Sequence, residues 1–251
     1  MRLSILVVSK TANLLNAMLS SLTKATTLGT TNVEILCSWN GSDEEELKIN
    51  NTSGYEFLQA NRDKYHFARN MNTLANKANG EILLLINDDV ILDPASIDSA
   101  IDCLINEHNA GLVGGQFRDK EGKLVHTGIV FDYRHSPYHQ LDKLVESDNE
   151  YFSNQNIVMP AVTGAFMLLK KENFLKLYLN ESYKVCGEDV ELCLELRQKL
   201  GLKIFYCSKA SGIHEAESTR KKSPKEEGND EDLSRLRMIR RKFLTTANSN
   251  Q

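Results

Sequence analysis

The sequence lacks the cysteine spacing of a zinc site or of a disulfide framework. Its five cysteines are odd in number, scattered along the chain and never spaced as Cys-x-x-Cys. Zinc sites of the finger type need such close pairs, and small secreted domains need an even set for their disulfides. The cysteine pattern therefore favours a reducing compartment.

Long hydrophobic runs are also lacking, since no apolar segment approaches the roughly 20 residues that span a bilayer. The opening MRLSILVVSK is too short an apolar run for a signal peptide and is more typical of a buried strand. We therefore expect a cytoplasmic protein, and a peripheral position at the inner face of a membrane stays open.

Neither sign of charge dominates the chain. It has 30 Lys and Arg against 34 Asp and Glu, a formal net charge of −4, which gives no sign of a nucleic-acid partner. Its 251 residues, 41% of them hydrophobic, can bury the core of one large domain or two small ones.

Three short apolar runs near the N-terminus, at 3–8, 33–38 and 81–87, predict strands that are covered on both faces. Helical patterns separate these runs: one follows Thr11, and the other extends from about Phe67 to Ala78. Alternating strands and helices indicate βαβ units, and hence an α/β fold with a mostly parallel sheet and right-handed crossovers.

The second half of the sequence is less regular. A helix is expected from near Pro94, a residue that suits the first helical position, to about His108. Further along, the patterns predict strands at 112–117 and 161–169, a loop-rich region at about 131–158, a helix and a strand within 187–207, a polar segment at 216–230 and a helix at 233–244. The last helix has a basic face, which is either a solvated surface or a contact with anionic lipid.

Two adjacent aspartates, Asp88 and Asp89, follow the apolar run at 83–87 directly. Like charges at the end of a buried strand repel each other unless a positive group compensates them. Ligands of parallel α/β sheets bind at the carboxyl ends of the strands, and hard cations such as Mg²⁺ take carboxylate oxygens there. A capped helix or a solvated turn is the alternative, and the residues alone leave both open.

A second acidic pair, Glu188 and Asp189, begins a predicted helix, and His214 follows a predicted strand. Acids in a first helical turn complement the helix dipole, and a lone histidine is commonly structural. The functional alternatives are a general base in the acidic pair and a nitrogen ligand at the histidine. Local pattern does not decide between them.

The order of these segments resembles that of family 2 glycosyltransferases with the GT-A fold, in particular their bacterial rhamnosyltransferase-like branch. The resemblance covers most of residues 1–218. It rests on LSILVVSK, EILCSWNGSD, FARNMNTLANKANGEILLLINDD, KEGKLVHTGIVF, VTGAFMLLKKENF and GEDVELCLELRQKLGLKIFYCSKASGIHEAES. It implies one GT-A domain at 1–215, with a nucleotide-sugar half at 1–93 and an acceptor and catalytic half at 94–215, followed by the polar segment and basic helix of 216–251.

The resemblance also implies roles for single residues. Asp89 and His214 would bind Mn²⁺ or Mg²⁺, Asp189 would be the catalytic base, and Glu188 would orient it or contact the acceptor. Contacts with the nucleotide sugar are expected from Ser9, Trp39, Asn40, Asn70, Asp88 and Gly164.

Trp39 is a departure from the family pattern, because many relatives have an aspartate there that contacts the nucleotide base. The indole could stack on a base, or Asn40 could form a hydrogen bond with it; a packed wall is the alternative for Trp39. The nucleotide is therefore left open. His126 and Gly128 match a recurring family feature for which we favour a structural role, and His139 lies in the loop region where acceptor contacts vary.

Taken together, the resemblance implies an inverting, divalent-metal-dependent glycosyltransferase of hexosyl or rhamnosyl type. Its partners would be a nucleoside-diphosphate sugar and a glycan or lipid-linked acceptor, in bacterial surface polysaccharide or lipopolysaccharide synthesis. The alternatives are a catalytically degenerate nucleotide-sugar-binding module and a metal-dependent phosphohydrolase. The phosphohydrolase would need a nucleophile or a second metal cluster, and the sequence shows no further tight Asp/His group.

Overall fold

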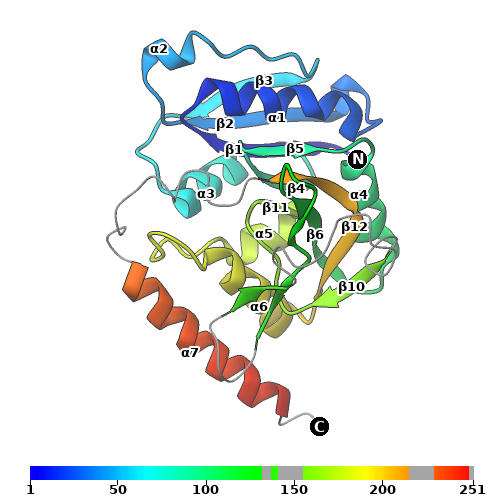
Figure 1. The fold of residues 1–251 in the computed structure, drawn as a ribbon, viewed down its shortest axis with the longest axis vertical. Helices are drawn as coiled ribbons and strands as arrows, with labels where there is room; N and C mark the ends of the chain where they lie inside the picture. The colour runs from blue at the N-terminus through cyan, green and yellow to red at the C-terminus, as the bar shows by residue number, and fades with distance from the viewer. Residues whose placement is uncertain (132–136, 141–154, 215–228, 249–251) are drawn as a thin grey trace.

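The computed structural model describes residues 1–131, 137–140, 155–214 and 229–248. One ten-stranded sheet forms the centre of the molecule, with helices on both faces (Figure 1). Its main path runs in the order β10-β12-β6-β11-β4-β1-β2-β3, with β5 paired to β12 and β7 to β6. The strands are β1 (Leu3–Ser9), β2 (Val33–Trp39), β3 (Glu56–Asn61), β4 (Ile82–Asn87), β5 (Val90–Leu92), β6 (Ala110–Arg118), β7 (Leu124–His126), β10 (Asn156–Met159), β11 (Phe166–Lys170) and β12 (Lys203–His214). The expected α/β fold is confirmed.

The N-terminal half of the sheet is parallel, as the sequence predicted. Strand β1 lies between β2 and β4, and Leu3 is in register with Val33 on one side and with Ile82 on the other. Side chains of β1 alternate between two cores: Leu3 and Ile5 pack on one face, and Leu6 packs on the other. Burial on both faces explains why these strands are almost continuously apolar in the sequence.

The C-terminal half of the sheet is mixed. Strand β11 is antiparallel to both β4 and β6, whereas β6 and β12 are parallel. The strand expected at 161–169 begins only at Phe166, and residues 161–165 form the segment that leads into it. Because β11 runs antiparallel to β4, this segment lies at the carboxyl end of β4, where Asp88 and Asp89 follow.

Helices cover the sheet in two layers. Helices α1 (Ala12–Ala25) and α4 (Ser96–Asn106) pack on one face, and α3 (Phe67–Lys77), α5 (Lys171–Leu177) and α6 (Glu188–Leu200) pack on the other. The short α2 (Asp43–Glu46) and the 3₁₀ turn η1 (Thr30–Asn32) flank β2 in the chain. The helix expected from near Pro94 is α4, but Pro94 is not its first residue, because Ala95 adopts a left-handed conformation (φ 60°) and the helix begins at Ser96.

The predicted basic helix is confirmed as α7 (Asn229–Asn248), which lies beside α6 at the end of the molecule away from β3 (Figure 1). It is anchored by Leu236, which is buried, and by Phe243, whose ring centroid lies 5.1 Å from that of Phe131. None of the helices in the described residues is both long enough and apolar enough to cross a bilayer. Most of the predicted polar segment at 216–230 lies outside the described residues.

Candidate active site

Asp88 and Asp89 form the turn between β4 and β5. Strand β5 pairs antiparallel with β12, and this register places His214 opposite Val90. His214 is therefore brought beside Asp89, with 3.2 Å between its Nε2 and the Oδ1 of the aspartate. Both side chains are largely buried, at 11% and 14% exposure.

Asp88 has a different partner from Asp89. Ser9, the last residue of β1, donates a hydrogen bond of 2.6 Å from its Oγ to Asp88 Oδ2. Burial raises the pKa of Asp88 to about 6, and the charge of Asp89 contributes to the rise, while the Ser9 hydrogen bond and the charge of Lys10 oppose it. The turn therefore concentrates negative charge that the surrounding protein compensates only in part.

The residues at the turn fit a divalent cation. Asp89 and His214 offer an oxygen and a nitrogen 3.2 Å apart, close to the roughly 3 Å that separates adjacent ligands of an octahedral ion with bonds of about 2.1 Å. A positive ion here would also offset the charge of Asp89 and favour the ionised form of Asp88, whose pKa is raised mainly by burial. Across the described ranges, no group of three or more His, Cys, Asp or Glu side chains meets at one point. Mg²⁺ ions shared with a substrate's phosphates often take only one or two carboxylates from the protein.

Asp189 lies in the first turn of α6, and both of its carboxylate oxygens accept backbone hydrogen bonds. Val190 N–H donates to Oδ1 and Gly164 N–H donates to Oδ2, each at 2.7 Å. Glu188 precedes it as the first residue of α6. The helix starts after Gly187, whose φ of +115° and whose contact with Tyr183 leave no room for a side chain. Two bonds hold the carboxylate of Asp189 in one orientation.

Gly164 and Ala165 join the acidic turn to Asp189. Asn87 N–H, just before Asp88, donates to Ala165 O at 3.1 Å, and the next residue back, Gly164, bonds to Asp189. A Cβ at position 164 would lie 3.3 Å from that of Asp189, so the glycine permits this close approach. A short backbone bridge therefore connects the two groups of acids, which the sequence separates by about 100 residues.

Trp39 and Asn70 are buried, which does not fit direct contact with a nucleotide. The indole of Trp39 is 1% exposed, and a Cβ on Gly41 would lie 2.5 Å from its ring, so Trp39 is the packed wall rather than a stacking platform. Asn70 is fully buried and accepts the backbone N–H of His66 at the start of α3. Asn40 lies next to Ser9, whose carbonyl accepts its backbone N–H at 2.8 Å, while its side chain donates to Asp63 O.

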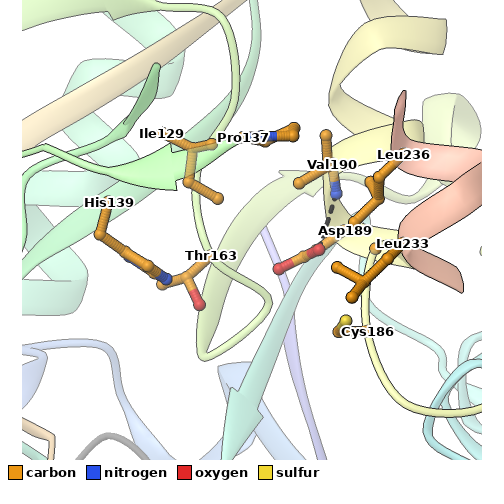
Figure 2. Close-up of a pocket in the computed structure, with 10 residues that line it drawn as sticks. Ile129, Pro137, His139, Thr163, Cys186, Asp189, Val190, Leu233 and Leu236 are labelled. Atoms are coloured by element: carbon orange, nitrogen blue, oxygen red, sulfur yellow. Dashed lines mark hydrogen bonds between the residues drawn. The ribbon is translucent and has the colours of Figure 1, made fainter. Parts of the chain in front are cut away.

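A cavity of about 220 Å³ lies beside Asp189. Figure 2 shows Ile129, His139 and Thr163 on one side of it and Asp189, Leu233 and Leu236 on the other. The remaining wall is formed by Pro137, Cys186, Gly187 and Val190. The two leucines belong to α7, so the C-terminal helix forms one wall of the cavity that Asp189 also lines.

The sequence model of "Glycosyltransferase like family 2" matches residues 2–234 of the chain. The chain belongs to this family. The predicted family resemblance is confirmed, and the matched region includes every site residue described above except Leu236. It also extends into α7, so the helix that closes the cavity is partly inside the match.

Two solved structures have the same fold as this family 2 chain. Mannosyltransferase PcManGT from Pyrobaculum calidifontis, in complex with GDP-Man and Mn²⁺, aligns over 90% of this chain and 58% of its own with a TM-score of 0.58 and 14% identity. GalNAc-T7, solved with UDP, GalNAc and Mn²⁺, aligns over 85% of this chain and 44% of its own with a TM-score of 0.61 and 12% identity. The fold is therefore GT-A, as expected.

A relative by sequence is the O-antigen biosynthesis protein RfbC of Myxococcus xanthus. The two are 30% identical over 159 residues, which is 60% of this chain and 12% of RfbC. This family 2 chain therefore corresponds to a small part of that relative.

Several residues at the cavity were not anticipated from the sequence: Thr163, Cys186, Leu233 and Leu236. The apolar spacing of Leu233 and Leu236 indicated a helix with a buried face, but it carried no signal of what that face would cover. Thr163 stood beside the predicted Gly164 without any motif of its own. His139 was noted only for its position in a variable loop, and the structure places it at the cavity (Figure 2).

Proposed function

We propose that this family 2 chain is an inverting, divalent-metal-dependent glycosyltransferase. It transfers a sugar from a nucleoside diphosphate to a hydroxyl of a glycan or lipid-linked acceptor. The observation that carries the proposal is the backbone bridge of Gly164 and Ala165, which joins the acidic turn to Asp189. Such a transfer needs two parts, a group that can bind a cation and a general base next to a cavity for the acceptor.

The donor side of the site is the acidic turn. Asp89 and His214 would hold the cation, and Asp88, oriented by Ser9, would bind the ribose or the sugar. A cation bound there would neutralise the negative charge that develops on the leaving diphosphate. The Mn²⁺ named with PcManGT and GalNAc-T7 supports the same type of cofactor here, Mn²⁺ or Mg²⁺, and their GDP-Man and UDP support a nucleotide-sugar donor.

The acceptor side is the cavity beside Asp189. Val190 N–H and Gly164 N–H each occupy one lone pair of a carboxylate oxygen, which leaves further lone pairs for a proton. Asp189 takes the proton of the acceptor hydroxyl as that oxygen attacks the sugar from the side opposite the diphosphate. Attack from that side inverts the anomeric centre, as in inverting glycoside hydrolysis.

The setting proposed is bacterial surface polysaccharide synthesis, which the likeness to an O-antigen biosynthesis protein supports. Transfer of a hexosyl or rhamnosyl group fits that setting. Helix α7 exposes Arg237, Arg241 and Lys242, which supports peripheral contact with anionic headgroups near a lipid-linked acceptor.

Calorimetric titration with UDP, GDP, dTDP and CMP, each with and without Mn²⁺, tests the donor site. We expect one nucleotide to bind only with Mn²⁺ and Asp89→Ala to abolish that binding, because the variant removes the carboxylate ligand next to His214. Asp102→Ala, which changes an exposed aspartate on α4, is the matched control and should bind like the unmodified chain.

Either of two results would contradict the proposed donor site: no binding of any nucleotide in the presence of Mn²⁺, or binding that Asp89→Ala leaves intact. Metal-dependent binding without sugar transfer to any acceptor would instead favour the degenerate binding module.

A further inference from the structure

Two histidines that the proposed reaction does not yet use lie one at the wall of the cavity and one directly behind it. His139, in the short strand β9 (Tyr138–His139), faces the cavity from the side opposite Asp189 (Figure 2). It is exposed, so a molecule in the cavity can reach it. His126 lies behind it at the end of β7, with 1% exposure.

The contacts of His126 are specific. Its Nδ1 lies 2.8 Å from Nδ1 of His139, and its Nε2 accepts the backbone N–H of Thr163 at 3.3 Å. Burial lowers the pKa of His126 well below its usual range, and the neighbouring His139 and His214 lower it further. His126 is therefore a neutral imidazole at physiological pH.

These contacts decide where the protons lie. A neutral imidazole carries one N–H, and a nitrogen that accepts a hydrogen bond is not the one that carries it. Since Nε2 of His126 accepts from Thr163, its proton is on Nδ1, which donates to Nδ1 of His139. Neutral His139 then carries its own proton on Nε2. The order of donation runs from the Thr163 backbone through His126 to His139.

We propose that His126 fixes His139 as an Nε2–H donor, and that this N–H binds an oxygen of the acceptor saccharide and orients it toward Asp189. The inference rests on the proposed function, because it names the residues that position the acceptor of that reaction. His139 contacts the acceptor, and His126 is a positioning residue that acts through His139.

The rest of the cavity suits a single sugar ring. Ile129, Leu233 and Leu236 form an apolar wall against which the C–H face of a pyranose packs. The volume of about 220 Å³ is below the roughly 300–1,000 Å³ of pockets for drug-sized ligands, which suits a small group such as one sugar ring. A donor at His139 and an acceptor at Asp189 then distinguish between saccharides by the positions of their oxygens.

Long-range ¹H–¹⁵N spectra of the histidine rings test the proton positions without any ligand. At pH 7 we expect the Nδ1–H form for His126 and the Nε2–H form for His139. In His126→Phe, His139 should become a mixture of both forms, because its fixed donor is gone. A predominant Nδ1–H form or a charged ring at His139 in the unmodified chain would overturn the proposal.

Binding of acceptor probes tests the second part. Methyl glycosides of rhamnose, mannose, galactose and N-acetylglucosamine are titrated in the presence of Mn²⁺ and the nucleotide identified by calorimetry. We expect at least one glycoside to shift the His139 Nε2 signal, and its Kd to rise about tenfold in His139→Ala, as for the loss of one hydrogen bond. His139→Gln should recover part of the affinity through its amide N–H, and the exposed His108→Ala is the matched control.

The nucleotide Kd separates this inference from the proposed function. It should be unchanged in His126→Phe and His139→Ala; a loss would show that the pair only supports the fold, and would overturn the acceptor role. If no glycoside shifts the His139 signal, or if His139→Ala leaves its affinity unchanged, that role is also wrong. Failure of the unmodified chain to bind any nucleotide with Mn²⁺ would instead count against the glycosyltransferase.

Discussion

Asp88 and Asp89 are neighbours in the chain but contact different residues. Asp88 accepts a hydrogen bond from Ser9 on β1, while Asp89 lies beside His214 on β12. The turn between β4 and β5 directs the two carboxylates toward strands on opposite sides of β4 in the sheet order. In the proposed donor site, this division would let Asp89 hold the cation while Asp88 binds the ribose or the sugar.

Asp189→Asn should separate binding from chemistry. The amide keeps the size of the side chain and one acceptor oxygen, but it cannot take a proton. We expect sugar transfer to fall by about 10²–10⁴-fold, the usual contribution of a general base, with nucleotide binding in Mn²⁺ within about twofold. Turnover and calorimetry measure the two effects, and Glu195→Gln on the same helix is the control.

Transfer at an unchanged rate in Asp189→Asn would show that another group takes the proton. Glu188, one residue earlier in α6, would then be the next residue to test.

At the scale of elements, α7 is attached to the start of α6 by one carboxylate. Asp232 is 1% exposed, and its Oδ2 accepts backbone hydrogen bonds from Lys184, Val185 and Cys186 at 3.0, 2.7 and 3.2 Å. These residues lead directly to Gly187 and to the turn that carries Asp189. The C-terminal helix therefore supports the proposed base as well as closing its cavity.

Asp232→Ala should loosen that support. It leaves three backbone N–H groups without the carboxylate, and we expect a loss of about 1–3 kcal/mol in the free energy of unfolding together with a lower rate of transfer. Denaturant unfolding measures the first effect, and faster hydrogen exchange at 184–186 localises it. Glu231→Ala, on the exposed neighbour that pairs with Lys184, should change neither. Equal exchange in both variants would contradict this role of Asp232.

The elements that sequence patterns predicted well are those with strong local signals. Helix α6 ends at Leu200 because Gly201 adopts the left-handed conformation, and β1, β2 and β4 carry almost continuous apolar runs. The pairing of Asp89 with His214 follows from the register of β5 on β12, which joins segments more than 100 residues apart and leaves no local pattern. The same holds for the docking of α7 and for the burial of Trp39, which depend on what packs against each side chain.

At the scale of the molecule, one hydrogen-bonded carboxylate ties each half of the sheet together, fully buried at Glu34 and partly exposed at Asp93. In the parallel half, Glu34 on β2 accepts hydrogen bonds from Ser4 on β1 and from Asn79 before β4, and it pairs with Arg2. In the mixed half, Asp93 accepts from Arg118 on β6 and Ser211 on β12. Burial alone would raise both pKa values, but these partners more than offset it and lower them.

The lowered pKa of Glu34 sets the sign of its effect on acid stability. In the unfolded chain Glu34 binds a proton near pH 4.5, whereas in the folded chain it stays ionised to a lower pH. The contribution of Glu34 to the stability of the fold is therefore complete above about pH 4.5 and is lost as the pH falls through the folded pKa. We expect Glu34→Gln to reduce the free energy of unfolding by about 1–3 kcal/mol at pH 7, because Glu34 is fully buried. This gap in stability between the unmodified chain and the variant should narrow below about pH 4.5.

Urea unfolding at a series of pH values measures that gap. Glu56→Gln is the matched control, since Glu56 pairs with Glu34 in the register of β2 and β3 and also approaches Arg2, at 3.8 Å, but is 57% exposed. Exposed pairs of this kind contribute about 0–1 kcal/mol, so the control should follow the unmodified chain across the range. A gap for Glu34→Gln that stays constant from pH 7 to pH 3 would mean that packing at this position, rather than its charge, joins β1 and β2 to the loop before β4.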